Sequence, residues 1–113
     1  MSLFSSFTLG ADGCISGMGS VAADLQAELF ACVQRGDLEA ARRVNDRLEP
    51  LVQVFYAPPF LDMHNRMKGA LAMLGRLERA VVRPPLPPIG DAERRGIAEA
   101  LRQAGLVEPA AAD

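Results

Sequence analysis

The feature that most constrains this chain is the segment GCIS, residues 13–16, which has the apolar character of a β-strand among helical patterns. A lone strand carries unpaired N–H and C=O groups along both edges. Burying each of these groups without a partner costs about 1–3 kcal/mol. No other segment of the 113 residues has a strand pattern that could pair with it. The segment therefore needs neighbouring strands from another chain or from a larger domain.

Helical periodicity describes most of the remaining sequence. Apolar residues recur at helical spacing after positions 20, 37, 59 and 91, and residues 2–10 form a further short apolar segment. Ser20, Asp37 and Asp91 are placed to accept free backbone N–H groups at three of these helix starts. Gly36 and Gly105 are placed to end helices in the left-handed conformation. The chain as given is therefore expected to be mostly α-helical.

Proline residues mark two expected interruptions. Pro50 lies within the second helical pattern, and a proline lacks the N–H that a helix interior uses, so we expect a kink or break near Glu49. The segment VVRPPLPPIG, residues 81–90, contains four prolines and is expected to be extended or turning.

Composition excludes several classes of partner. Half of the residues are hydrophobic and the net charge is −2, so nothing favours binding to nucleic acid or to an anionic membrane. No apolar run approaches the roughly 20 residues that span a bilayer, and the first residues lack a basic start, which favours a cytoplasmic location.

Cys14 and Cys32 are expected to be reduced, buried thiols, and two cysteines with one histidine do not provide a recognisable zinc site.

Three features suggest chemistry, and each has a simpler structural interpretation. Residues 17–22 fit the G-x-G-x-x-A pattern of a dinucleotide-binding loop, but a second strand ending in an acidic residue does not follow. Lys68, the only lysine, invites a Schiff-base role, yet no acid or base is within evident reach, so a surface position is expected. His64 stands alone and is interpreted as structural.

The order of several motifs resembles the C-terminal part of the dihydrodipicolinate synthase / N-acetylneuraminate lyase family. The resemblance covers residues 9–107. The motifs that carry it are LGADGCISGMGSVA, GDLEAARRVNDRLEPLVQVFY, RMKGALAMLG, VRPPLPPIG and ALRQAGL.

This resemblance implies the α/β architecture of a (β/α)8 TIM barrel, with a C-terminal helical extension. Residues 1–36 would hold the end of the barrel, with a remnant of helix seven, strand eight and helix eight, and residues 37–113 would form the extension. Strands seven and one, the neighbours that GCIS needs, are then expected upstream of residue 1. Active sites lie at the C-terminal ends of barrel strands. The backbone of Ile15 and the segment formed by Ser16 and Gly17 are therefore expected to line the substrate pocket.

The resemblance also implies a reaction. Family members are lyases that form a Schiff base between a barrel lysine and pyruvate or another 2-oxo acid, without a cofactor, commonly as homotetramers. That lysine and its tyrosine partner belong to strands outside this chain, so we expect no catalytic residue within it, and Lys68 inherits no such role. PPFLDMHNRMK replaces the NPIPVK-like run of many members, which leaves sugar-acid aldolases and dehydratases open as relatives. The alternative hypothesis is a non-catalytic helical oligomerisation or interaction module.

Overall fold

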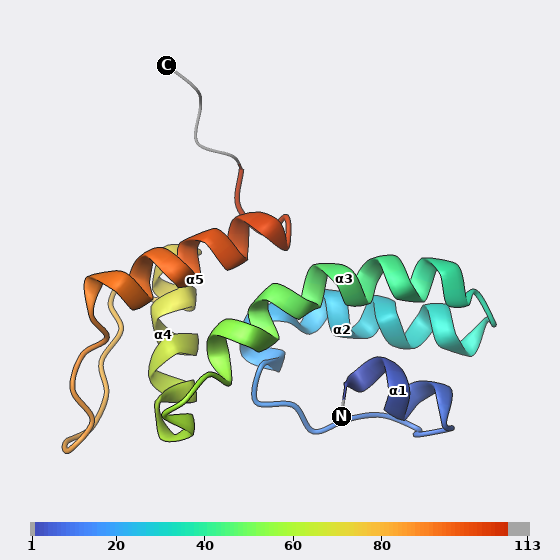
Figure 1. Ribbon diagram of the computed structural model, residues 1–113, viewed down its shortest axis with the longest axis horizontal. Coiled ribbons are helices and arrows are strands. Elements are labelled where there is room, and N and C mark those ends of the chain that lie inside the picture. Colours follow the sequence, from blue (N-terminus) through green and yellow to red (C-terminus); the bar gives the residue numbers. More distant parts are fainter. Residues whose placement is uncertain (1, 109–113) are drawn as a thin grey trace.

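The computed structural model describes residues 2–108 and shows a helical assembly (Figure 1). The elements in order are α1 (Leu3–Thr8), α2 (Gly19–Gln34), α3 (Leu38–Phe55), the 3-10 helix η1 (Phe60–Asp62), α4 (Met63–Met73) and α5 (Asp91–Gln103). Helices α2 and α3 pack side by side, α1 contacts both, and α5 lies over α3 and α4 (Figure 1). Residues 109–113 of the expected helical extension lie outside the described residues.

The turn between α2 and α3 forms as the sequence predicts. Gly36 has a φ of 76°, a left-handed conformation that glycine adopts without strain, and the N–H of Asp37 donates to the carbonyl of Cys32 at 3.0 Å. The Asp37 side chain then accepts a hydrogen bond from the N–H of Ala40 at 3.0 Å. This cap begins α3 directly after α2 ends, and the short turn makes the two helices antiparallel neighbours.

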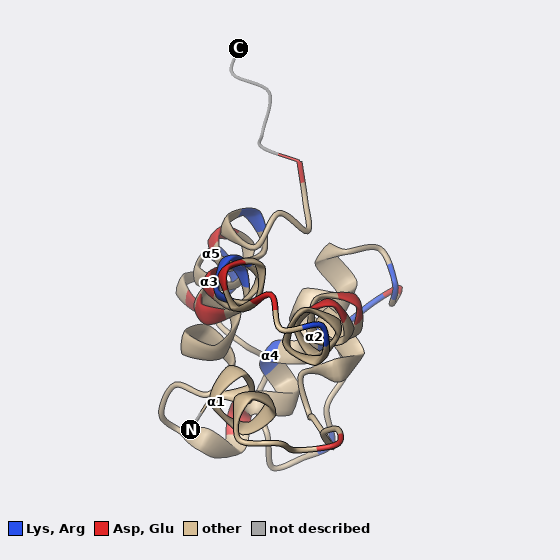
Figure 2. Ribbon diagram, turned by 90° about the vertical axis from the view of Figure 1, so that its right-hand side faces the viewer, with Lys and Arg blue, Asp and Glu red and all other residues tan. Residues whose placement is uncertain are grey.

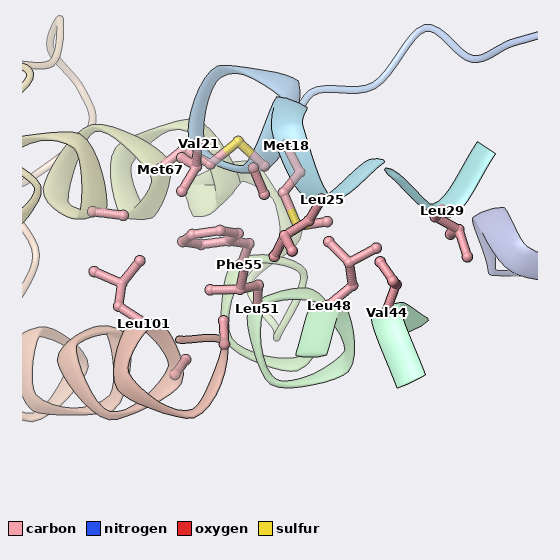
Figure 3. Packing of buried hydrophobic residues seen from close by; sticks show 14 of the residues in the cluster. Met18, Val21, Leu25, Leu29, Val44, Leu48, Leu51, Phe55, Met67 and Leu101 are labelled. Atoms are coloured by element: carbon pink, nitrogen blue, oxygen red, sulfur yellow. The ribbon is translucent and has the colours of Figure 1, made fainter. Parts of the chain in front are cut away.

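The hydrophobic core lies between the helices (Figure 3), and its residues are buried. Leu29 on α2, Leu51 and Phe55 on α3, and Leu101 on α5 are each 0% exposed. Fully burying a side chain of this size contributes about 1.5–3 kcal/mol. The packing of these apolar faces therefore holds together helices that are separated in sequence.

The strand expected at residues 13–16 does not form, and this part of the prediction is wrong for the chain as it stands. Residues 11–16 have no regular secondary structure, and no strand occurs anywhere in residues 2–108. The Ile15 side chain is fully exposed, at 108% of its reference area. The physical reason is the one that made the segment unusual. A strand exists only when a neighbouring strand exchanges backbone hydrogen bonds with it, and the described part of the chain provides no such neighbour.

A kink or a break was expected near Glu49, and the break does not occur, because α3 continues through Pro50 to Phe55. Proline removes only one intrahelical hydrogen bond, that to the carbonyl four residues earlier. That residue, Asp46, is exposed, so water can reach its backbone. Leu48 and Leu51 on either side of the proline are buried, and their packing keeps the helix continuous.

Two of the expected helix caps are wrong, whereas the end of α5 at a glycine forms as expected. Ser20 lies inside α2, where its hydroxyl donates to the carbonyl of Gly17 at 3.4 Å instead of capping the helix. Asp91 is the first residue of α5, and Gly90 occupies the cap position. At the end of α5, Gly105 has a φ of 71°, and a hydrogen bond of 2.9 Å from the next N–H closes the helix as predicted.

The two cysteines have different environments. Cys32 is buried in the core, as expected, whereas Cys14 is exposed because it lies in the irregular segment that has no neighbouring strand. Both are free thiols.

Charged residues of both signs are mixed on the helices seen in Figure 2. This mixing agrees with the small net charge of −2. Within residues 2–108, no helix combines the length and the apolar composition that crossing a membrane requires.

Candidate functional site

A cavity of about 290 Å³ lies between α1, α3 and the segment that follows the irregular stretch. Its wall includes Ile15, Ser16 and Gly17, the three residues that the sequence singled out. The remaining lining residues are Ser2, Leu3, Ser6, Met18, Gln26, Asn45, Leu48, Glu49, Val52 and Tyr56.

Ser16 and Gly17 are held by contacts with distant helices. The Ser16 hydroxyl oxygen accepts a hydrogen bond of 2.8 Å from the side-chain amide of Gln26 on α2, and Gln26 is only 6% exposed. The position that a Cβ would occupy at Gly17 is 3.6 Å from the Tyr56 hydroxyl and 3.8 Å from the Met67 Cε. The end of the irregular segment is therefore anchored by α2, α3 and α4, although its earlier residues are not paired.

One face of α3 provides the opposite wall. Asn45, Leu48, Glu49, Val52 and Tyr56 are spaced three, four and seven residues apart in the helical manner that brings them to one side. The side-chain amide of Gln53 donates to the Glu49 carboxylate at 2.6 Å. We did not assign this face a site role from the sequence. The only available signal was a set of polar residues that interrupts an apolar stripe.

The cavity has both apolar and polar walls, and its described side chains carry no positive charge. Among the described residues that line it, none is a lysine, arginine or histidine, and Glu49 is the one carboxylate. Hydroxyl and amide groups of this kind exchange hydrogen bonds with hydroxyl or carbonyl oxygens of a ligand. The described lining residues provide no side-chain amine for a Schiff base. Within residues 2–108, no group of three or more histidine, cysteine, aspartate or glutamate residues is arranged to hold a metal ion.

Lys68 and His64 lie outside the cavity lining. The Lys68 ammonium donates to the carbonyl of Val81 at 2.7 Å, and the residue is exposed. His64 is also exposed, and its Cε1 atom is 4.0 Å from the Cβ position at Gly17. The surface position expected for Lys68 is therefore confirmed.

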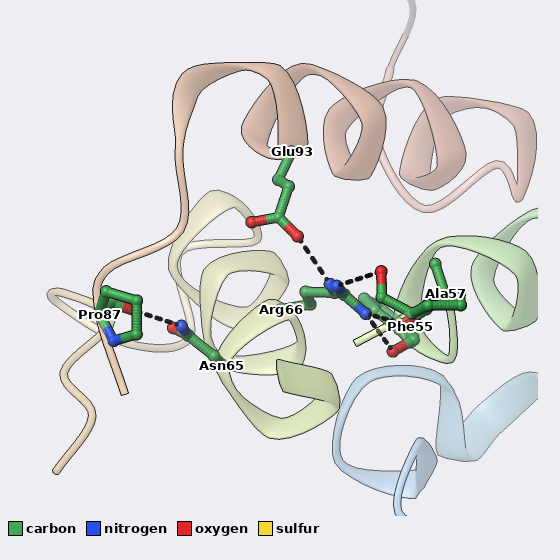
Figure 4. Close-up of polar contacts among 7 residues, drawn as sticks. Phe55, Ala57, Asn65, Arg66, Pro87 and Glu93 are labelled. Carbon is green, nitrogen blue, oxygen red and sulfur yellow. Dashed lines mark hydrogen bonds and ion pairs between the residues drawn. The ribbon is translucent and has the colours of Figure 1, made fainter. Parts of the chain in front are cut away.

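A buried arginine connects α3, α4 and α5 (Figure 4). The Arg66 side chain is 3% exposed and forms an ion pair of 2.9 Å with Glu93 on α5. It also donates to the carbonyls of Phe55 at 3.3 Å, of Ala57, and of Pro58 at 3.4 Å. The end of α3, which carries Tyr56 beside Gly17, is therefore fixed by a charged group from α4.

A second polar contact fixes the proline-rich segment. The side-chain amide of Asn65 donates to the carbonyl of Pro87 at 2.7 Å, and Asn65 is 2% exposed. The extended segment before α5 is thereby attached to α4 (Figure 4). This buried pair was not found from the sequence, because the two residues are far apart in the chain.

Solved structures with the same arrangement define the class of the fold. A structure described as the first monomeric dihydrodipicolinate synthase variant superposes with a TM-score of 0.82 and 28% identity, over 93% of this chain and 34% of that one. Dihydrodipicolinate synthase from Thermotoga maritima gives a TM-score of 0.79 and 29% identity, over 93% and 34% of the two chains. The class is therefore that of dihydrodipicolinate synthase folds. The TIM barrel expected from the sequence is not formed within residues 2–108.

The sequence model of the Dihydrodipicolinate synthetase family matches residues 2–104, and the chain belongs to this family, of which it corresponds to a C-terminal part. Over 99 residues it is 39% identical to 4-hydroxy-tetrahydrodipicolinate synthase from Bartonella bacilliformis, covering 88% of this chain and 32% of the relative. The corresponding protein from Thermodesulfovibrio yellowstonii is 35% identical over 101 residues, covering 88% and 33%. The chain thus spans about a third of the length of these relatives.

Proposed function

We propose that this chain is part of a class I lyase that forms a Schiff base with pyruvate or another 2-oxo acid. In this proposal residues 1–36 complete a (β/α)8 barrel, residues 37–113 form its helical extension, and the reactive lysine lies outside the 113 residues. The observation that carries the proposal is the family match over residues 2–104. The irregular state of residues 11–16 supports it, because a segment of strand composition without a partner is what a separated barrel strand would become.

Within this function, Ile15, Ser16 and Gly17 line the substrate pocket. Active sites of such barrels lie at the C-terminal ends of the strands, and these three residues end the segment that we assign as strand eight. Their position in the wall of a cavity supports the assignment. The segment contributes backbone groups and the Ser16 hydroxyl, which orient the substrate without taking part in covalent chemistry.

The proposed enzyme requires no cofactor, because the lysine amine itself activates the carbonyl carbon as an iminium. We further propose a homo-oligomer in the cytoplasm. The substrate is a small 2-oxo acid, and neither nucleic acid nor membrane is a partner.

Borohydride reduction tests the reaction directly, because it converts a Schiff base between lysine and pyruvate into a stable secondary amine. The 113-residue chain is expected to remain unmodified by pyruvate and borohydride, and a longer protein that includes the upstream strands is expected to gain one adduct on a lysine outside these residues. Mass spectrometry of the digested protein locates the adduct. An adduct at Lys68, or none in the longer protein, would refute the proposal.

A non-catalytic helical module is the second candidate, and the closed core supports it. Phe55, Ile97 and Leu101 are fully buried without any contribution from a barrel, so the helices have a core of their own. Size-exclusion chromatography with circular dichroism separates the two candidates. A monomer or defined oligomer that melts cooperatively favours the module, whereas aggregation through the unpaired segment favours the separated barrel.

A further inference from the structure

We propose that Gln26 is a positioning residue of the pocket, which holds the Ser16 hydroxyl so that its proton points at an oxygen of the bound 2-oxo acid. The inference rests on the proposed function in taking Ser16 as part of the wall that faces the substrate. The observation that carries it is a hydrogen bond of 2.8 Å, in which the side-chain amide of Gln26 donates to the Ser16 hydroxyl oxygen.

Gln26 occupies a position of α2 where packing alone favours an apolar residue. Its side chain is 6% exposed, and the other buried residues of α2 are hydrophobic: Val21, Ala22, Leu25, Leu29 and Cys32. Burying an amide is unfavourable unless the amide is hydrogen-bonded. The Ser16 hydroxyl is therefore the partner that makes this amide compatible with the core-facing side of the helix.

The contacts around this pair fix the position of Ser16. The Gln26 Oε1 atom lies 3.5 Å from the position that a Cβ would occupy at Gly19, so the amide is confined on the side away from Ser16 as well. The N–H of Gly19 donates to the Ser16 carbonyl at 3.1 Å. Both the backbone and the side chain of Ser16 are thus held, although the residues before it are irregular.

The hydrogen bond from Gln26 determines how the Ser16 hydroxyl faces the cavity. A serine hydroxyl has one proton to donate and two lone pairs that accept. Gln26 occupies one lone pair, and within residues 2–108 the Ser16 hydroxyl donates to no other group. Because both residues line the cavity, the proton is available to a ligand there. A 2-oxo acid presents carboxylate and carbonyl oxygens, which accept such a proton.

A change from amide to carboxylate tests this role with almost no change of shape. Gln26→Glu replaces the donor by an acceptor, so the Ser16 proton turns to the new carboxylate and its lone pairs face the substrate. In the longer protein, the pyruvate concentration that gives half-maximal trapping by borohydride is expected to rise about tenfold, the loss of one hydrogen bond to a charged group. Gln34→Glu is the matched control, because it adds the same charge at the exposed end of α2 and should leave that concentration unchanged.

A neutral variant separates positioning from folding and from added charge. Gln26→Met has a similar shape but cannot donate, so the Ser16 hydroxyl samples its three staggered positions and the half-maximal concentration should rise about threefold. In a chain that also carries Ser16→Ala, Gln26→Met should cause no further rise, because Gln26 acts only through that hydroxyl. A variant that fails to fold would instead lose adduct at every pyruvate concentration. Additive losses, or an unchanged concentration in the folded variants, would overturn the proposal.

The hydrogen bond itself is tested in the 113-residue chain, without any reaction. Nuclear magnetic resonance of the 15N-labelled chain measures the exchange of side-chain amide protons with water. Exchange at Gln26 is expected to be slower than at the exposed Gln34 and to become roughly fivefold faster in Ser16→Ala, the effect of one neutral hydrogen bond. Exchange at Gln34 should not change. Equal rates at Gln26 with and without the Ser16 hydroxyl would refute the positioning role.

The outcome is distinguishable from a failure of the proposed function. If the longer protein never traps pyruvate, the lyase proposal fails, and the exchange measurement still decides whether Gln26 holds the Ser16 hydroxyl. If pyruvate is trapped and Gln26→Glu does not change the half-maximal concentration, the positioning role fails and the lyase proposal stands.

Discussion

Replacing Arg66 by methionine is expected to destabilise the helical part of the chain by about 3 kcal/mol. Methionine keeps much of the buried stem volume and removes only the guanidinium group. The contacts that Arg66 makes do not contribute equally to this loss of stability. Glu93 is 40% exposed at its side chain and Pro58 is exposed, so water replaces the guanidinium at both. The carbonyls of Phe55 and Ala57 lie at the end of α3, and each unpaired acceptor costs about 1–3 kcal/mol.

Urea unfolding followed by circular dichroism measures this change, and the thermal midpoint should fall by roughly 12 °C for a chain of this size. Arg43→Met provides the matched control, because Arg43 pairs at 2.8 Å with Glu39 on the exposed face of α3 and such pairs contribute about 0.3–0.5 kcal/mol. Equal losses in the two variants would show that the buried carbonyls do not depend on Arg66, and the reasoning would be wrong.

Three further changes test the fold. Asp37→Ala removes the cap of α3 and should cost about 1 kcal/mol in urea unfolding, so an unchanged midpoint would contradict the capping role. Leu51→Ala, at a site that is 0% exposed, should cost about 3 kcal/mol, whereas Leu38→Ala, at 49% exposure, should cost much less; similar losses would contradict the assigned core. The pKa of Glu99 is lowered by its hydrogen bond from Arg102, so this pair adds stability above the ordinary glutamate value of about 4.3, and that stability is lost as the pH falls through the lowered pKa. Glu99→Gln should therefore lose slightly less stability between neutral and acid pH than the parent chain, and an identical or steeper pH dependence would contradict this.

Features that depend on a few neighbouring residues could be predicted from the sequence. The left-handed glycine Gly36 and the cap Asp37 are positions where the local backbone alone selects the residue type. Ser20 has the right chemistry for a cap but lies inside α2. The helix starts earlier because the neighbouring Met18 and Val21, at 2% and 1% exposure, are drawn into the core.

Features that depend on distant partners could not be predicted. A strand at residues 13–16 requires hydrogen bonds from chain segments that are not among the 113 residues, so its composition alone does not produce it. Continuity through Pro50 depends on the packing of Leu48 and Leu51 against other helices, which outweighs the local preference for a break.

Some residues of the candidate site could likewise be predicted from the sequence and others could not. The prediction that Ile15, Ser16 and Gly17 line a pocket came from the family resemblance, which carries positional information that residue chemistry lacks. The α3 residues that line the cavity were missed, because the cavity depends on how α1 and the irregular segment lie against α3. The sequence shows only that polar residues interrupt an apolar stripe, which is also typical of a solvent-exposed helix edge.

Amide hydrogen exchange at Cys14 and Ile15 tests most directly whether this segment is a barrel strand that needs partners from elsewhere. In the 113-residue chain both amides should exchange as fast as in an unstructured peptide. In a longer protein that includes the upstream strands, both should be strongly protected. Protection in the short chain, or unprotected exchange in both proteins, would contradict the account.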